Sequence, residues 1–226
     1  MNMNMFEQFM SPELLHTPTI ILSILIPAMM IHNSPKLMGN RMMTAISWFL
    51  KTIMLNMTSH LTPEGQKWGR VLTSLLLFIL ISNLINLLPY TFATTSQLSM
   101  NMALAIPLWL ATIITGMTKN PSNTLAHLLP EGSPTALIPF MVLIETISLF
   151  MRPLALGVRL MANITAGHLL ITMISSATFN LINTYIILSI LSSALLFILT
   201  ILELAVACIQ AYVFVLLITL YLQENT

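Results

Sequence analysis

Two apolar stretches near the C-terminus, each about 40 residues long, constrain the fold of this 226-residue chain more than any other feature. They cover residues 136–176 and 181–222. At 1.5 Å per residue, a helix of this length is roughly 60 Å long, whereas the hydrocarbon core of a bilayer is roughly 30 Å thick. Each stretch therefore holds either two membrane spans or one helix that is steeply tilted from the membrane normal.

The composition of the two stretches favours the tilted arrangement. Two spans would need a polar turn between them, and neither stretch contains one. Pro153 and Gly157 can kink the first stretch, but the second contains no proline and no glycine. Since ordinary spans tilt by only about 20°, we predict an unusual pair of long helices, inclined by about 60° and joined near residues 175–184.

The whole chain is predicted to be an all-α integral membrane protein with a single membrane domain. Hydrophobic residues make up 57% of it and charged residues 7%, against about 25% charged residues in soluble domains. A net charge of +1 gives no attraction to nucleic acid. The predicted elements are a span at 14–31, an interfacial amphipathic helix at 36–60, a helical hairpin with spans at 71–88 and 98–117, and the long tilted helices at 136–176 and 181–222.

The connection after the first predicted span indicates how the chain is oriented in the membrane. It is apolar but interrupted by Lys36, Arg41 and Lys51, which is typical of a helix that lies in the membrane interface. Basic residues favour the matrix or cytoplasmic side. We therefore expect this connection and the C-terminus on the inner side and the N-terminus on the outer side. Prolines and a glycine in residues 120–134 predict a loop.

Arg159 is the first candidate functional residue, because it lies in the middle of the first long stretch. An arginine cannot lose its proton in a protein, and at bilayer depth its charge costs roughly 3 kcal/mol. At about 100° per residue, Arg152, Asn163 and Glu145 lie on the same helix face as Arg159. An intramembrane ionisable residue is by default part of an ion or proton path.

Further polar side chains lie on both sides of Arg159 along the helix axis. His168 lies roughly 13 Å toward the outer side, and Glu145 lies roughly 21 Å toward the inner side. On the second long stretch, Glu203 and Gln210 are seven residues apart and share a face. Two offset half-paths need this arrangement, with His168 and Glu203 in an outer group and Glu145 in an inner one.

Each of these side chains also has a structural interpretation, and the residues alone leave both open. In the structural interpretation, Arg152 either extends its charged end to the membrane interface or pairs with Glu145. His168 is then a buried histidine whose hydrogen bonds are satisfied within the chain, and Glu203 is a protonated acid that makes a hydrogen bond. The amides of Asn163 and Gln210 hold helices together.

Three segments resemble subunit a of the F-type ATP synthase. They are R-L-M-A-N-I-T-A-G-H at residues 159–168, E-L-A-V-A-C-I-Q-A-Y-V-F at residues 203–214 and S-N-L-I-N-L-L-P-Y at residues 82–90. The likeness extends over the whole chain, and its 18 methionines resemble the mitochondrially encoded animal form. The resemblance implies a stator subunit of the mitochondrial inner membrane that is not an enzyme by itself, with its N-terminus in the intermembrane space and its C-terminus in the matrix.

The resemblance also implies roles for three residues around the central cation. Arg159 matches the essential arginine that faces the rotor ring of subunit c. Asn163 matches the polar residue one turn further on, and Gln210 matches the glutamine opposite the arginine.

Three further positions match the half-channels of the family. His168 and Glu203 match outer half-channel positions at which acid and histidine are exchanged in bacterial relatives, and Glu145 matches an inner half-channel acid. The bacterial relatives have an extra acidic loop that this chain lacks, so its entry funnel must be built otherwise.

The implied partners are the c-ring, other membrane-sector and peripheral-stalk subunits, the lipid bilayer and the transported protons. No cofactor and no metal site is expected, and no G-x-x-x-x-G-K-[ST] motif for ATP chemistry is present. Two alternatives of other classes remain. An antiporter-like subunit of a redox-driven proton pump would carry mid-span lysines, whereas no lysine follows Lys119. A non-conducting assembly subunit would have no reason to carry costly charges in its spans.

Overall fold

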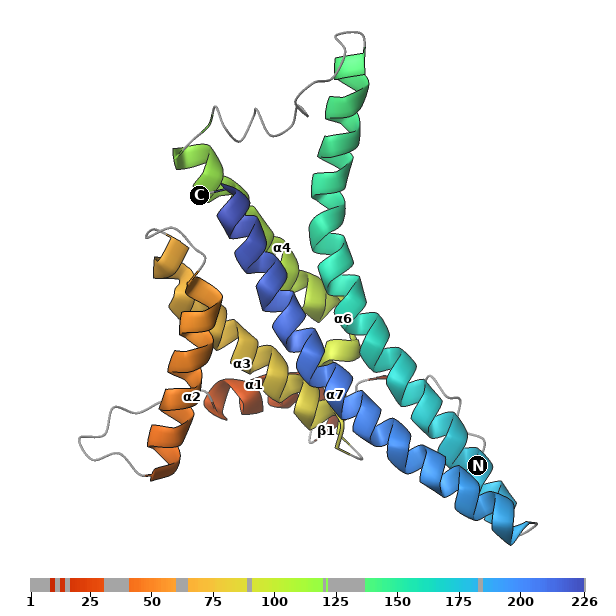
Figure 1. Ribbon diagram of the computed structural model, residues 1–226. Helices are drawn as coiled ribbons and strands as arrows, with labels where there is room; N and C mark the ends of the chain where they lie inside the picture. Colours follow the sequence, from red (N-terminus) through yellow and green to blue (C-terminus); the bar gives the residue numbers. More distant parts are fainter. Residues whose placement is uncertain are drawn as a thin grey trace. The chain divides into compact units, whose positions relative to one another are not determined.

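The computed structural model describes residues 9–10, 13–14, 17–30, 41–59, 65–88, 91–119, 121, 137–182 and 185–225. Within these ranges the chain is almost entirely helical (Figure 1), which confirms the all-α class. The helices are α1 (Thr19–Met30), α2 (Arg41–Thr58), η2 (Gly65–Trp68), α3 (Gly69–Asn86), η3 (Thr94–Ser96), α4 (Leu98–Lys119), α6 (Ile138–Ile182) and α7 (Ile186–Asn225). Two-residue strands, β1 (Glu13–Leu14) and β2 (Thr17–Pro18), form one short antiparallel pairing.

Four of these helical segments are long and apolar enough to cross a membrane, so the chain has the build of a multi-pass membrane protein. They are Gly65–Asn86, Leu98–Lys119, Ile138–Ile182 and Ile186–Glu224.

Each long apolar stretch forms one uninterrupted helix, as predicted. Helix α6 has 45 residues and α7 has 40. Pro153 lies inside α6, although it cannot donate the usual backbone hydrogen bond of a helix. The steep inclination of the two helices to the membrane stays a prediction.

The connection between α6 and α7 lies later than the sequence predicts. Helix α6 continues to Ile182 instead of ending near residue 176, and α7 begins at Ile186. The reason lies in the polar residues that suggested a turn. The hydroxyls of Ser175, Ser176 and Thr178 donate to carbonyls of their own helix, so these side chains are satisfied without a break in the helix.

The N-terminal helix is shorter than the span predicted at 14–31. Helix α1 has 12 residues, which gives about 18 Å, and a bilayer core is about 30 Å thick. Thr17 and Pro18, directly before it, are extended, and Thr17 is biased toward the β region because it precedes a proline. The described helix is therefore too short to span a bilayer by itself, and residue 31 lies outside the described residues.

The remaining predicted helices are present with shifted ends. The interfacial helix predicted at 36–60 is α2, with residues 36–40 outside the described part. The spans predicted at 71–88 and 98–117 are α3 and α4. Trp48 and Phe49 on α2 are 70% and 52% exposed, which supports the interfacial position that we predict for this helix. Of the loop predicted at 120–134, only residue 121 is described.

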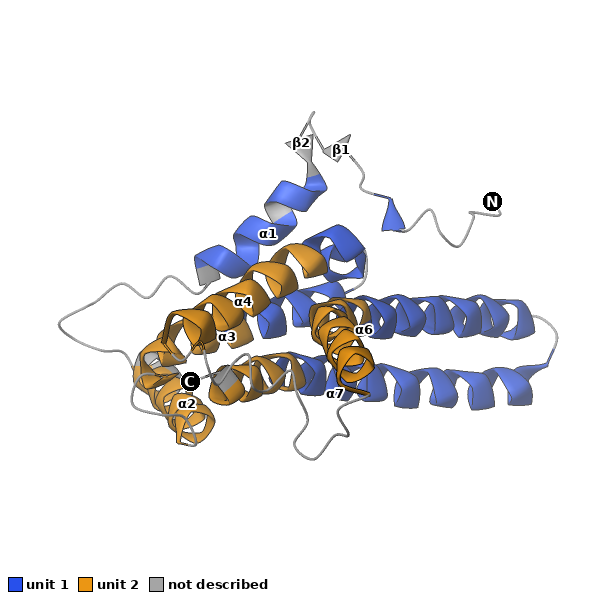
Figure 2. Cartoon of the chain, turned by 90° about the horizontal axis from the view of Figure 1, so that it is seen from above, with its two compact units in different colours: residues 1–32, 77–100, 159–212 blue, residues 33–76, 101–158, 213–226 orange. Residues whose placement is uncertain are grey.

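The chain divides into two compact units, coloured in Figure 2. The first contains residues 1–32, 77–100 and 159–212, and the second contains residues 33–76, 101–158 and 213–226. Divisions fall inside α3, α4, α6 and α7, so each of these helices contributes to both units. The single membrane domain stays a prediction.

In the first unit, segments of α3, α6 and α7 supply the buried core. The parts of α6 and α7 that belong to this unit run side by side in Figures 1 and 2. Ile79 of α3, Leu160 of α6 and Ala211 of α7 are almost fully buried there. Ala207 and Ala211, one turn apart, leave room for the neighbouring helices to approach α7 closely.

The core of the second unit contains larger side chains. Leu72, Leu156 and Phe214 are nearly inaccessible. The rings of Trp109 on α4 and Phe150 on α6 lie with their centroids 5.8 Å apart, a separation typical of aromatic pairs. Helices α4 and α6 are therefore packed directly against each other in this unit.

Gly157 allows this close packing, and its replacement by valine tests it. An ideal Cβ at Gly157 would lie 2.6 Å from Sδ of Met102. Gly157→Val should therefore lower the free energy of unfolding by about 1–3 kcal/mol, seen as a lower thermal midpoint of the detergent-solubilised protein. Met102→Ala in the same chain should restore much of the loss. A Gly157→Val protein of unchanged stability would contradict the tight α4–α6 contact.

Candidate functional site

Buried polar side chains gather in the first unit, on α3 and α7. On α3, Asn86 lies on the same side as Ser82 and Asn83, four and three residues before it, and all three are buried. Helix α7 contributes Glu203 and Gln210, which are also buried. Polar groups in an otherwise apolar bundle are costly unless they have a purpose, so this group is the candidate site.

The carboxyl group of Glu203 lies against α6. An ideal Cβ placed on Gly167 would be 2.5 Å from Glu203 Oε1 and 2.9 Å from its Cδ. The absence of a side chain at Gly167 therefore lets the carboxyl reach the backbone of α6. Since His168 is the next residue, Glu203 lies against the segment of α6 that carries His168. That the two side chains belong to one outer group stays a prediction.

Several polar atoms of this region have no hydrogen-bond partner among the described residues. They are Nε2 of His168, both carboxyl oxygens of Glu203 and Oδ1 of Asn83, all of them buried. Buried polar atoms nearly always have a partner. Buried polar atoms that have no partner among the described residues can be satisfied by bound water.

Helix α3 makes a hydrogen bond with α7 close to Glu203. The Nδ2 atom of Asn83 donates to the carbonyl of Ala207 at 3.3 Å, one turn beyond Glu203 on α7. We call Asn83, Asn86, His168 and Glu203 the polar cluster. Its members come from three helices that are far apart in the sequence.

The amides of Asn163 and Gln210 form a second link between α6 and α7. Asn163 Nδ2 donates to Gln210 Oε1 at 2.8 Å. Arg159 lies one turn before Asn163 on the same face of α6 and is exposed. Within the described part of the chain, the Arg159 guanidinium has neither an ion pair nor a side-chain hydrogen bond.

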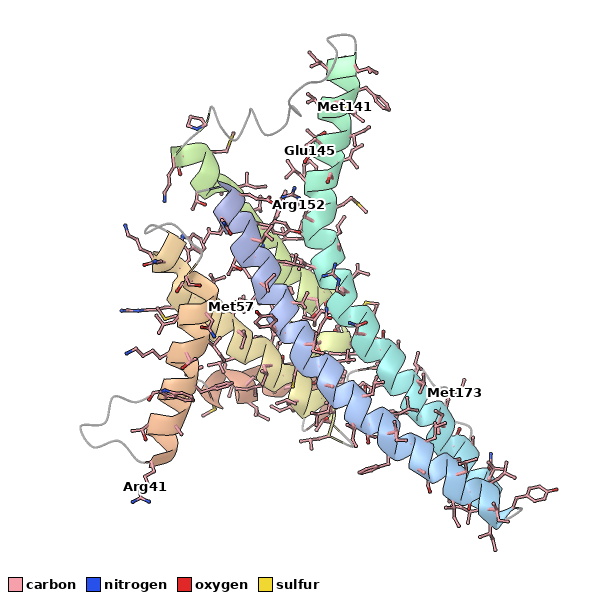
Figure 3. The ribbon with its side chains drawn as sticks, viewed as in Figure 1. Arg41, Met57, Met141, Glu145, Arg152 and Met173 are labelled. Carbon is pink, nitrogen blue, oxygen red and sulfur yellow. The ribbon has the colours of Figure 1, made fainter. Side chains whose placement is uncertain are left out.

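Arg152, in the second unit, has a different environment. Its Nη1 atom lies 2.6 Å from Glu224 Oε2, and its Nη2 atom lies 3.9 Å from Glu145 Oε1. The ring of Tyr221 lies 5.0 Å from the guanidinium carbon. Arg152 and Glu145 stand on the same helix, α6, in Figure 3. The predicted pairing of Arg152 with Glu145 is present, but the closer partner is Glu224.

The structure thus separates the predicted site residues into two groups. The residues in the first unit are Arg159, Asn163, His168, Glu203 and Gln210, whereas Glu145 lies in the second. Among the described residues, no three His, Cys, Asp or Glu side chains are grouped to hold a metal ion.

Sequence reasoning missed Asn83, Asn86 and Glu224. The spacing of the two asparagines, at the end of an apolar helix, was a readable signal of a polar face. Nothing local marked Glu224, because its partner is 72 residues away in the chain.

Comparisons with known proteins agree along the full chain. The model of the family described as ATP synthase A chain matches residues 14–223. The chain is 75% identical to ATP synthase F(0) complex subunit a of Lycodon semicarinatus, over all 226 residues of both chains. It is 57% identical to the protein of the same name from Struthio camelus and 53% identical to that from Salmo salar, again over the whole of each chain.

Removing the Arg152 charge should loosen the end of α7, since Glu224 would lose its partner. We expect Arg152→Gln to cost about 1 kcal/mol or less, because the pair is partly exposed, and to speed amide hydrogen exchange over residues 213–225. Arg70→Gln, which removes an exposed arginine of α3, is the matched control and should leave this exchange unchanged. Equal exchange in the two variants would mean that the ion pair does not hold the last turns of α7.

Proposed function

Because this chain belongs to the ATP synthase A chain family, the proton-translocating stator subunit of the membrane sector, we propose that it carries protons through two offset half-channels separated by Arg159. Membership of this family gives no support to the two alternatives, an antiporter-like subunit of a redox-driven pump and a non-conducting assembly subunit. The observation that carries the proposal is the exposed Arg159 cation, which has no ion pair within the described residues.

Arg159 acts on a carboxylate of the c-ring. Its permanent charge lies on the same helix face as Asn163, and Asn163 is held by Gln210. An exposed guanidinium at bilayer depth is costly, so a carboxylate on a neighbouring subunit is its natural partner. The cation stabilises the ionised carboxylate by attraction and repels a proton that would pass directly from one half-channel to the other.

The polar cluster forms the outer half-channel. A proton enters by way of His168 and Glu203 and neutralises the carboxyl of a c subunit. The buried polar atoms of this cluster that lack a partner among the described residues support a hydrated path. A neutral carboxyl can face lipid, whereas a charged one cannot do so cheaply. The ring therefore turns in one sense, away from Arg159.

Glu145 serves the inner half-channel, where the carboxyl ionises again after nearly a full turn of the ring. Its Oε1 atom is 3.9 Å from Arg152, at the limit of an ion pair, whereas Glu224 holds the same guanidinium at 2.6 Å. Glu145 is therefore not locked in a tight pair and stays available to exchange protons. Each charge that crosses the membrane gains about 2.3 kcal/mol per 100 mV, and this free energy drives the rotation.

The subunit acts in the mitochondrial inner membrane, with its N-terminus in the intermembrane space and its C-terminus in the matrix. Its partners are the c-ring and other membrane-sector and peripheral-stalk subunits, and it is not an enzyme by itself. The high methionine content and the basic residues around α2 support this location and orientation.

Replacing Arg159 is the direct test of the proposal. Arg159→Gln should abolish ATP synthesis driven by an imposed proton gradient while the complex still assembles, and should raise the passive proton leak of the same vesicles. Arg152→Gln, the matched change seven residues earlier on α6, should keep synthesis, because that arginine is paired within the chain. Normal synthesis and no added leak in Arg159→Gln would show that Arg159 has only a structural role.

The contact of Glu203 with Gly167 gives a second test. Gly167→Ala should displace the Glu203 carboxyl and slow proton flow through the membrane sector by roughly tenfold or more. ATP hydrolysis by the detached catalytic head should be unaffected. Glu203→Asp in the same chain shortens the acid and should recover part of the flow, because it makes room for the new methyl group. Unchanged flow in Gly167→Ala would remove Glu203 from the proposed path.

A further inference from the structure

We propose that Glu224 is a positioning residue of the inner half-channel, because it holds the Arg152 guanidinium against α7 and so keeps Glu145 available for proton exchange. The inference rests on the proposed inner path through Glu145. It gives a purpose to an arginine that the proposed proton path does not otherwise use, although a charge in an apolar helix is costly. It also gives a purpose to an acid that sequence reasoning missed.

Helix α7 holds Arg152 with two side chains that lie one turn apart. The Nη1 atom of Arg152 donates to Oε2 of Glu224 at 2.6 Å, a short charge-assisted hydrogen bond. The ring of Tyr221, three residues before Glu224, lies 5.0 Å from the guanidinium carbon, within the range of a cation–π contact. All three residues belong to the second unit. Both contacts therefore hold the arginine against α7.

The contact of Glu145 with the same guanidinium is longer. Glu145 and Arg152 stand seven residues apart on α6, as Figure 3 shows. Oε1 of Glu145 lies 3.9 Å from Nη2 of Arg152. Ion pairs within a helix form best between residues three or four positions apart. Over seven positions the two residues are separated by about 10.5 Å along the helix axis, so both side chains must extend to meet. Glu145 is thus the weaker of two carboxylates that compete for one cation.

The place of Glu224 in its helix also indicates that it serves Arg152. Glu224 lies in the last turn of α7, which contains no basic residue. An acid is disfavoured there, because the unpaired carbonyls at a helix C-terminus carry a negative partial charge. A cation next to this turn offsets that cost, and Arg152 supplies one from α6. Arg152 therefore meets a carboxylate and the negative end of a helix together, whereas Glu145 offers its carboxylate alone.

Loss of the Glu224 charge should transfer Arg152 to Glu145. Among the described residues, Glu145 is the only other carboxylate within ion-pair distance of this guanidinium. The side chains of Arg152 and Glu145 are 26% and 37% exposed, so both have room to move closer. A carboxylate that makes a short charge-assisted hydrogen bond with arginine must break that bond before it takes up a proton. Proton exchange at Glu145 should therefore become slower.

The first test neutralises Glu224 in the assembled ATP synthase. Glu224→Gln should slow gradient-driven proton flow roughly two- to fivefold, the range for a partly exposed ion pair. Glu224→Asp keeps the charge and should lose less. Gln223→Ala, a change at the exposed neighbouring residue, is the matched control and should behave as the parent. Parent-like flow in Glu224→Gln, or equal losses in Glu224→Gln and Glu224→Asp, would overturn the proposal.

Removing the arginine as well separates positioning from general stability. If Glu224 acts by holding Arg152, Arg152→Gln in the Glu224→Gln chain should restore the flow that Glu224→Gln loses, since no arginine is left to pair with Glu145. If Glu224 only fastens the end of α7, or passes protons itself, the double variant should be as slow as Glu224→Gln or slower. A double variant without recovery would therefore overturn the proposal.

Glu145→Gln distinguishes a failure of this inference from a failure of the proposed inner path. In a Glu145→Gln background, Glu224→Gln should add no further loss of flow, and additive losses would contradict the positioning role. If Glu145→Gln by itself leaves the flow unchanged, the inner path through Glu145 fails, and the positioning role fails with it. If Glu145→Gln slows the flow while Glu224→Gln does not, only the positioning role fails.

Discussion

The cost of a charge in an apolar environment is the constraint on which the rest of this structure depends. Two arginines stand seven residues apart on α6, and neither can lose its proton. Arg152 is met within the chain by Glu224 and, more distantly, by Glu145. One turn beyond Arg159 lies the neutral amide pair of Asn163 on α6 and Gln210 on α7, and Arg159 has no ion pair with a carboxylate among the described residues. This difference supports the proposal that Arg159 interacts with a carboxylate of the c-ring.

The same distinction separates the polar groups of the first unit. Asn163 and Gln210 satisfy each other across α6 and α7 and act as a fixed link. In the polar cluster, by contrast, Glu203 and His168 keep buried atoms without a partner in the described chain. Gly167 brings the backbone of α6 close to the carboxyl by having no side chain. In the proposed path, the groups that take up and release a proton are thus held in position by their surroundings, without strong bonds of their own among the described residues.

Continuous apolar composition allowed the two long helices to be predicted, because helix formation in lipid follows from the need to satisfy every backbone group locally. The turn between them was placed too early, since Ser175 and Thr178 satisfy their hydroxyls on their own helix. The described helix α1 begins at Thr19, later than the predicted start at residue 14, and Pro18 biases Thr17 before it toward the extended conformation. The position of a helix end depends on local interactions between side chains and the backbone, and composition does not determine it.

The sequence by itself determined the membrane class, the long helices and the identity of Arg159, His168 and Glu203 as costly polar residues, because composition and helical period are local properties of the chain. Only the tertiary structure decided which residues contact one another across the helices. The link between Asn163 and Gln210 spans 47 positions, that between Arg152 and Glu224 spans 72, and that between Asn83 and Ala207 spans 124. These pairings depend on the rotation and register of packed helices, to which residues distributed over the whole chain contribute.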